Sequence, residues 1–188
     1  MSGKWSSVGS HNPRKFKCGY CDSQVGSEKG YYSEQDTSRR IFICPACFRP
    51  TFFEEGKQFP GAAYGNKVDS LPEDIKVLYD EARRAISVTS FTGAVMLCRK
   101  ILMNIAVSQK APIGQTFIQY VEYLAQNGFI PPNGKHWVDH IRKKGNEANH
   151  EITVMSETDA QELISFVEML LKFIYEFPSK VPMTGINS

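Results

Sequence analysis

The stretch SFTGAVMLCRKILMNI, residues 90–105, decides the fold class of most of this 188-residue chain. Its apolar residues recur every three or four positions, so on a helix they form one continuous stripe. Such a stripe is stable only when it is buried against other elements. We therefore predict a core helix, with Cys98 as a small core residue. Its inward positions are Phe91, Ala94, Val95, Cys98, Ile101, Leu102 and Ile105.

The sequence on both sides of this helix continues the helical pattern over residues 70–178. SLPE at 70–73 predicts a helix start with Ser70 as its N-cap. A third helix is expected to stop at Asn127-Gly128, a fourth to cover Trp137 to about Glu151, and a fifth to begin near Ser156 and end at Pro178. Five helices joined by short loops indicate an antiparallel bundle.

Residues 14–58 have a different composition, of short β-strands and turns, and residues 59–69 form the predicted linker. CGYC (18–21) and CPAC (44–47) are separated by 22 residues, of which DSQVGSEKG (22–30) is predicted to form turns. Two such hooks complete a closed tetrahedral zinc site, so we expect one structural Zn²⁺ per chain, bound by Cys18, Cys21, Cys44 and Cys47. Redox dithiols are the alternative, but they normally begin a helix. The expected fold is mainly α, with a small β zinc ribbon before the bundle.

The aromatic residues of this ribbon allow two interpretations. Together with Arg39 and Arg40 they could stack unpaired bases and hold phosphate. A very small domain also needs aromatic side chains to cover its metal core, and the sequence favours that interpretation.

Charge and hydropathy limit the class of protein. The net charge is only +2, so a uniformly basic nucleic-acid-binding surface is excluded and any such surface must be local. The N-terminal residues lack the apolar core of a secretory signal, and charges interrupt the apolar run 163–177. We expect a cytoplasmic protein with no membrane partner, in which the cysteines stay reduced.

The stretch HIRKKGNEANHE, residues 140–151, carries the candidate catalytic chemistry. On a helix, Arg142, Asn146 and His150 lie on one face, flanked by Lys143 and Lys144. A histidine can move protons, an arginine can clamp a phosphate and an asparagine can orient the histidine. These are the groups needed for metal-independent RNA cleavage. A solvated helix face with a capping histidine is the alternative.

Several phrases together resemble the family called domain of unknown function 4145: LPEDIKVLYDEARRAI, GAVMLCRKIL, YVEYLAQNGFI, WVDHIRKKGNEANHE and DAQELISFVEMLLKFIYEFP. The resemblance covers roughly residues 70–178, and members with a preceding zinc ribbon extend it to residues 14–55. The family is grouped with the HEPN superfamily. This implies a HEPN-like helical bundle that dimerises, and a prokaryotic defence or stress function. Many such proteins are metal-independent endoribonucleases, and others are inactive binding modules.

The resemblance also assigns roles to single residues. It gives Arg142, Asn146 and His150 catalytic roles, Lys143 and Lys144 RNA contacts, and Arg99 either a phosphate contact or a structural role. In the usual HEPN signature four to six residues separate the arginine from the histidine, whereas seven separate Arg142 from His150, so Arg142 lies one residue further away. Two functions remain open. The first is RNA binding with or without cleavage. The second is a non-catalytic interaction module or accessory subunit of a restriction or anti-phage complex. A homodimer and a defence-system protein are the expected partners.

Overall fold

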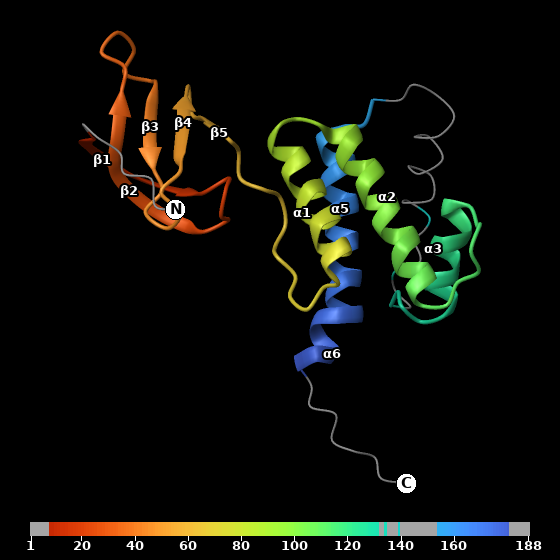
Figure 1. Cartoon of the computed structure of the whole chain (residues 1–188). Coiled ribbons are helices and arrows are strands. Elements are labelled where there is room, and N and C mark those ends of the chain that lie inside the picture. Colours follow the sequence, from red (N-terminus) through yellow and green to blue (C-terminus); the bar gives the residue numbers. More distant parts are fainter. Residues whose placement is uncertain (1–7, 132–133, 135–138, 140–153, 181–188) are drawn as a thin grey trace. The chain divides into compact units, whose positions relative to one another are not determined.

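The computed structural model describes residues 8–131, 134, 139 and 154–180 (Figure 1). The chain divides into two compact units, Met1–Ala63 and Tyr64–Ser188. The first contains the β-strands and the second the helices.

The N-terminal unit is an antiparallel meander in which each strand pairs with the next one along the chain. Successive turns of a meander lie at alternate ends of the sheet. The β1–β2 and β3–β4 turns, which contain the two cysteine pairs, therefore lie at the same end. Its strands are β1 (Gly9–Lys17), β2 (Gln24–Tyr32), β3 (Arg40–Ile43), β4 (Pro50–Glu54) and β5 (Lys57–Phe59).

Strand β2 corrects one sequence-based prediction. Residues 22–30 contain two glycines and several polar residues, which indicated turns, yet most of them lie in a regular strand. Gly30 is needed there, because a Cβ at this position would lie 1.7 Å from the carbonyl oxygen of Ile41 on β3. Ser27 is buried and donates a hydrogen bond of 2.7 Å to the carbonyl of Ile43. These small residues allow close approach of two strands rather than a turn.

A cluster of three phenylalanines forms the centre of the sheet's core. Phe16, Phe42 and Phe53 are buried. The ring centroid of Phe53 lies 5.3 Å from that of Phe16 and 5.7 Å from that of Phe42, and both pairs meet edge to face. The buried Cys18 and Cys44 belong to the same cluster. Part of the aromatic content therefore does cover the cysteine site, as the sequence favoured.

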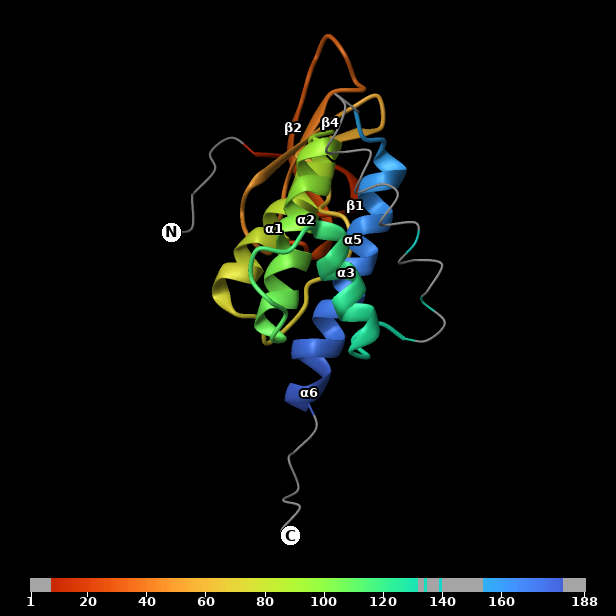
Figure 2. The ribbon, with the colours of Figure 1, turned by 90° about the vertical axis from the view of Figure 1, so that its right-hand side faces the viewer.

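The C-terminal unit is built around helix α2 (Phe91–Ser108), which contacts α1 (Glu73–Ser87), α3 (Phe117–Gln126) and α5 (Glu157–Leu171) (Figures 1 and 2). Six of the seven predicted inward positions of α2 are buried, and Phe91 is half-buried. Of the described helices, α2 also has the length (18 residues) and the mean hydropathy (1.3) that a membrane span would have. Inside the protein, 44% of this stretch is buried. The predicted fourth helix lies outside the described residues.

Two helix boundaries lie where the sequence predicts them, and one helix start does not. Helix α5 begins after Ser156, which caps it in a reciprocal box with Asp159, and α3 ends at Asn127 followed by Gly128 in a left-handed conformation. The box predicted at Ser70 does not form, because Ser70 itself has a φ of 60° and its hydroxyl pairs with Ser179. Helix α1 begins at Glu73, after Pro72, without a side-chain cap.

The last helix does not end at Pro178, which corrects a third prediction. After α5 the chain makes a π-helical turn, η2 (Lys172–Glu176), and continues into α6 (Phe177–Lys180). A proline needs a position where its ring and missing N–H do not disturb a regular i→i−4 hydrogen bond. The wider turn just before it interrupts that regular pattern.

The predicted linker, residues 59–69, is largely ordered within the two units. Phe59 belongs to β5, and the Lys17 ammonium donates to the carbonyl of Ala63. In the helical unit, the buried Arg83 of α1 donates to the carbonyls of Tyr64 (2.9 Å) and Gly65 (3.0 Å). Glycine and proline content indicated a tether here, but these hydrogen bonds fix the backbone.

Candidate functional site

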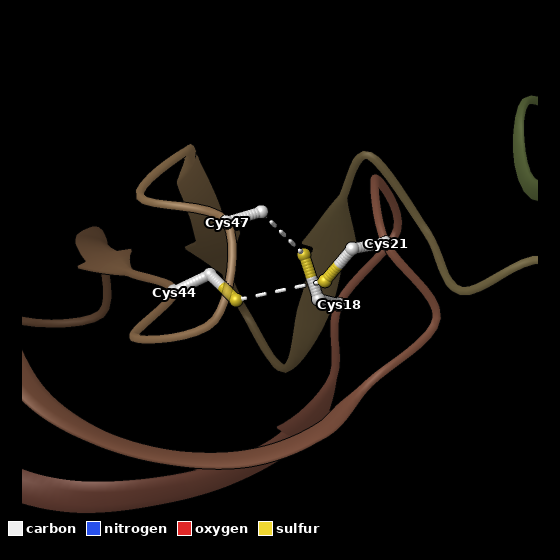
Figure 3. A group of neighbouring side chains, drawn as sticks. All are labelled: Cys18, Cys21, Cys44 and Cys47. Atoms are coloured by element: carbon white, nitrogen blue, oxygen red, sulfur yellow. Dashed lines mark hydrogen bonds between the residues drawn. The ribbon is translucent and has the colours of Figure 1, made fainter. Parts of the chain in front are cut away.

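The four predicted metal ligands meet at one end of the sheet (Figure 3). The Cys18 and Cys47 sulfurs are 3.7 Å apart, those of Cys21 and Cys44 are 3.8 Å apart, and all four lie within 4.8 Å of one another. A disulfide needs about 2.05 Å between sulfurs. The cluster is therefore a set of thiols arranged around a common point, compatible with a metal ion.

The same local hydrogen bonds shape both turns. In the first, the Cys18 N–H donates to Ser23 (2.9 Å) and the Asp22 N–H donates to the Cys18 carbonyl (2.9 Å). In the second, Cys44 donates to Arg49 (3.0 Å), and the N–H four residues after it donates back to its carbonyl (2.8 Å). Both turns place that fourth residue at a positive φ, 63° for Asp22 and 58° for Phe48. Two equivalent turns thus present two sulfurs each.

Glycine at position 19 allows a third segment to pack on the first turn. A Cβ there would lie 2.4 Å from the carbonyl oxygen of Gly61 and 2.6 Å from that of Pro60. The Gln58 side chain holds this segment in place by donating to the carbonyls of Lys17 (2.8 Å) and Pro60 (3.0 Å). Residues 58–61 therefore support the outer side of the cysteine site.

Thiol acidity differs within the cluster. Burial raises the pKa of Cys18 and raises that of Cys47 to about 12. Burial also acts to raise the pKa of Cys21, but hydrogen bonds involving Ser23 outweigh it and lower the value to about 7. Without a cation, four close thiols resist full ionisation, whereas a bound metal favours the thiolates. The donor set therefore fits a thiophilic metal.

Exposed side chains surround the cysteine turns. Tyr20 lies between the first two cysteines and is 39% exposed, and Phe48, directly after Cys47, is 49% exposed. The guanidinium of the exposed Arg49 lies over the Tyr20 ring, 5.1 Å from its centroid. Two exposed aromatic rings and a cation are thus presented by the two neighbouring cysteine turns, and we call these three residues the knuckle patch (Tyr20, Phe48 and Arg49).

The predicted nucleic-acid contacts Arg39 and Arg40 lie at the opposite end of the sheet, at and before the start of β3. Arg39 pairs with Glu54 (2.7 Å) and Asp36 (3.2 Å), and Arg40 donates to the carbonyl of Thr37 (3.2 Å). In this arrangement both arginines stabilise the β2–β3 turn.

Comparison with known families decides the classification of the helical part. The model of the family described as Domain of unknown function (DUF4145) matches residues 80–188, more than half of the chain. The chain belongs to this family. No curated protein matches it, and no solved structure does.

Arg99 is buried in the DUF4145 domain, 6% exposed, on the inner side of α2. Its guanidinium stacks on Phe117, 4.5 Å from the ring centroid, and burial lowers the pKa of the side chain. The structure thus places Arg99 in the packing between α2 and α3. The other predicted residues of this domain, Arg142, Lys143, Lys144, Asn146 and His150, lie outside the described residues.

A polar network at Glu168 of the DUF4145 domain was not predicted from the sequence. Glu168 is 9% exposed and accepts hydrogen bonds from the Asn66 N–H (2.8 Å), the Asn66 side chain (3.0 Å) and the Lys172 ammonium. One signal was present. Glu168 interrupts the apolar run LISFVEMLL on the buried side of its helix, where a charged residue needs partners.

Proposed function

We propose that the N-terminal unit is a zinc ribbon that binds single-stranded nucleic acid, preferably RNA, through the knuckle patch. The zinc assignment is supported by the sulfur distances. Four ligands at about 2.3 Å from a tetrahedral Zn²⁺ lie about 3.8 Å from one another. The Cys18–Cys47 and Cys21–Cys44 separations of 3.7 and 3.8 Å match this spacing. All four ligands are cysteines, so the ion is structural and leaves no position for a substrate.

The observation that carries the binding proposal is the exposure of Tyr20 and Phe48 beside Arg49. Neither ring belongs to the buried core of the sheet, formed by Phe16, Phe42 and Phe53. Exposed aromatic rings stack unpaired bases of any sequence, and an arginine between them can contact phosphate. Residues 1–66 carry a net charge of +3, against −1 for the remainder, which favours a polyanionic partner on this unit.

Fluorescence anisotropy with a labelled oligouridylate, a single-stranded DNA and a duplex tests this proposal. Wild-type protein should bind the single strands more tightly than the duplex. The double variant Tyr20→Ala/Phe48→Ala should lose about tenfold or more in affinity, because each stacked base contributes about 1–3 kcal/mol. Zinc content is measured on every variant to confirm that the ribbon is folded.

Matched controls lie on the same sheet. Tyr32 is 60% exposed at the end of β2 away from the cysteine turns, and Lys57 is exposed at the start of β5. The control variants Tyr32→Ala and Lys57→Gln should change the affinity less than twofold. In the knuckle patch itself, Arg49→Gln should weaken binding and reduce the salt dependence of the affinity. Equal binding by wild type and Tyr20→Ala/Phe48→Ala would contradict the proposal.

The DUF4145 domain is proposed to be HEPN-like and to supply the catalytic part. Arg142, Asn146 and His150 form the candidate site for metal-independent RNA cleavage, supported by their spacing in the sequence. A panel of labelled RNAs is incubated briefly with wild type and His150→Ala in EDTA, with zinc content measured afterwards. Cleavage that disappears in the variant supports a ribonuclease. No cleavage by wild type leaves a binding module or an accessory subunit of a defence complex.

A further inference from the structure

A pocket of about 410 Å³ lies in the helical unit, between residues 64–66 and one face of α5, η2 and α6. It contains none of the residues considered so far for nucleic-acid binding or cleavage. Pockets of this size accommodate small organic molecules. Its chemistry can be derived from its floor, its polar edge and its aromatic edge.

The floor of the pocket is rigid and electrostatically balanced. Glu168 accepts from the Asn66 backbone, the Asn66 amide, the Lys172 ammonium and, at 3.4 Å, the Tyr79 hydroxyl. Gly65 has a φ of 69°, and a Cβ there would lie 2.8 Å from a carboxylate oxygen of Glu168. This glycine lets the backbone close over the carboxylate. Because Glu168 is saturated and its charge is opposed by Lys172, the floor favours a neutral ligand.

The polar edge of the pocket has unused hydrogen-bonding capacity. Asn66 is exposed, and one amide hydrogen binds Glu168, which leaves the second hydrogen and the Oδ1 atom without a partner among the described residues. The Ser165 hydroxyl donates its one hydrogen to the carbonyl of Gln161 (2.8 Å). In its contact with the Tyr64 hydroxyl (3.3 Å), Ser165 is therefore the acceptor and Tyr64 the donor. An amide offers a donor beside an acceptor, and it pairs best with a ligand that has the same two groups in reverse.

The aromatic edge is formed by Phe173 and Phe177. Their side chains are 49% and 44% exposed, and the two rings meet edge to face with centroids 5.4 Å apart. Phe173 lies in the π-helical turn η2 and Phe177 directly follows it. π-helical turns are rare and occur frequently at functional sites. Two exposed rings beside an unpaired amide are suited to a planar ring with a polar edge.

We propose that this pocket binds a small, neutral aromatic compound with a hydrogen-bond donor next to an acceptor at its edge, as in an aryl amide or a cyclic amide. The ring packs against Phe173 and Phe177, and its polar edge pairs with the Asn66 amide. The proposal is independent of the knuckle patch and of the catalytic stretch 140–151, because it uses neither.

The test is an NMR titration of the full-length protein with benzamide, N,N-dimethylbenzamide and cyclohexanecarboxamide. Benzamide has both features of the ligand, the second compound lacks the donor and the third lacks the aromatic ring. Benzamide should shift the resonances of Phe173, Phe177 and the Asn66 amide. The other two should bind several-fold more weakly, because one aromatic contact contributes about 0.5–1.5 kcal/mol and one neutral hydrogen bond a similar amount.

Variants and a second probe complete the test. Phe173→Ala and Phe177→Ala should each weaken benzamide binding several-fold, whereas Met96→Ala, a 49% exposed residue on α2, should not. Free uracil and a short oligouridylate present the same donor–acceptor edge. Comparing their effects on the pocket resonances shows whether the pocket binds the free ring or a ring within a polymer. The proposal is overturned if benzamide leaves the pocket resonances unchanged, or if all three amides bind equally well.

Discussion

The two units of this chain reach stability by different means. The sheet buries a core of Phe16, Phe42 and Phe53 with Cys18 and Cys44 of the cysteine cluster, whereas the helical unit buries apolar residues from α1, α2, α3 and α5. A very small core cannot offset the entropy of ordering the chain, so such modules need a cross-link or a metal. The larger apolar core of the described helices is expected to be stable without either. The predictions below separate these two sources of stability.

Removal of the metal should have the largest effect. Because a structural zinc ion contributes about 10 kcal/mol or more to folding, Cys44→Ser should unfold the ribbon and abolish zinc binding. In two-dimensional NMR spectra the resonances of β1–β5 should collapse, while those of α1, α2, α3 and α5 stay dispersed. Cys98→Ala is the matched control, since this buried thiol lies in α2 and the zinc content should not change. A ribbon that remains folded without metal would show that the metal is not its main source of stability.

Truncation in the helical core should reverse the pattern. Leu102 is fully buried on α2, and Leu102→Ala should lower the free energy of unfolding of the helical unit by about 2–5 kcal/mol. Zinc content should remain at one ion per chain. Met96→Ala on the same helix is exposed and should cost less than about 0.5 kcal/mol. Denaturation followed by circular dichroism at 222 nm measures both; loss of zinc in the Leu102 variant would show that the units are coupled.

The Glu168 network should make the helical unit sensitive to acid. Burial acts to raise the pKa of Glu168, but hydrogen bonds from Lys172 and Asn66 outweigh it, and the pKa falls below its usual 4.5. Its contribution is therefore complete above that value and is lost as the pH falls through the lower folded-state pKa.

Glu168→Gln should cost about 1–3 kcal/mol at pH 7, because a charged hydrogen-bond acceptor is lost. Urea denaturation between about pH 7 and pH 3 should show a smaller decline for this variant than for wild type. Glu81→Gln, at an exposed position on α1, is the control. Parallel pH profiles for wild type and Glu168→Gln would contradict the assigned network.

The smallest effect is expected at the surface of the ribbon. Arg39 is half-exposed and pairs with Glu54 and Asp36, so Arg39→Ala should cost about 0.2–1 kcal/mol. Thermal melting of the zinc-bound protein measures this loss of stability. The difference in melting temperature between wild type and Arg39→Ala should shrink in about 1 M NaCl, where exposed ion pairs are screened. A cost above about 2 kcal/mol would mean that this turn, and not the metal alone, holds the ribbon together.

Features set by local periodicity could be predicted. The stripe Ala94, Val95, Cys98, Ile101, Leu102 and Ile105 is buried because a helix repeats every 3.6 residues, whatever it packs against. The cysteine cluster was predictable because each Cys-x-x-Cys turn places two sulfurs by short-range geometry. The Ser156 cap was predictable for the same reason, since its bonds reach only three residues.

Features set by distant neighbours could not be predicted. The glycines and serine of β2 indicated a turn, and the closeness of β3 explains two of these residues, Gly30 and Ser27. Ser70 has the sequence of a cap, but the preceding segment, bound by Arg83 and Glu168, leads the chain into a different conformation. Pro178 has the sequence of a helix end, but the π-helical turn before it lets the helix continue.

The sequence by itself determined the division into a cysteine-rich β unit and a helical unit, the cluster of four cysteines and the buried stripe of α2. It could do so because these features depend on repeat distances of a few residues. Only the tertiary structure decided that Tyr20, Phe48 and Arg49 form one exposed patch, that Arg99 is buried against Phe117, and that Glu168 supports a pocket. The reason is physical: burial and hydrogen-bond partners are properties of the packed chain, and they join residues more than a hundred positions apart, such as Asn66 and Glu168.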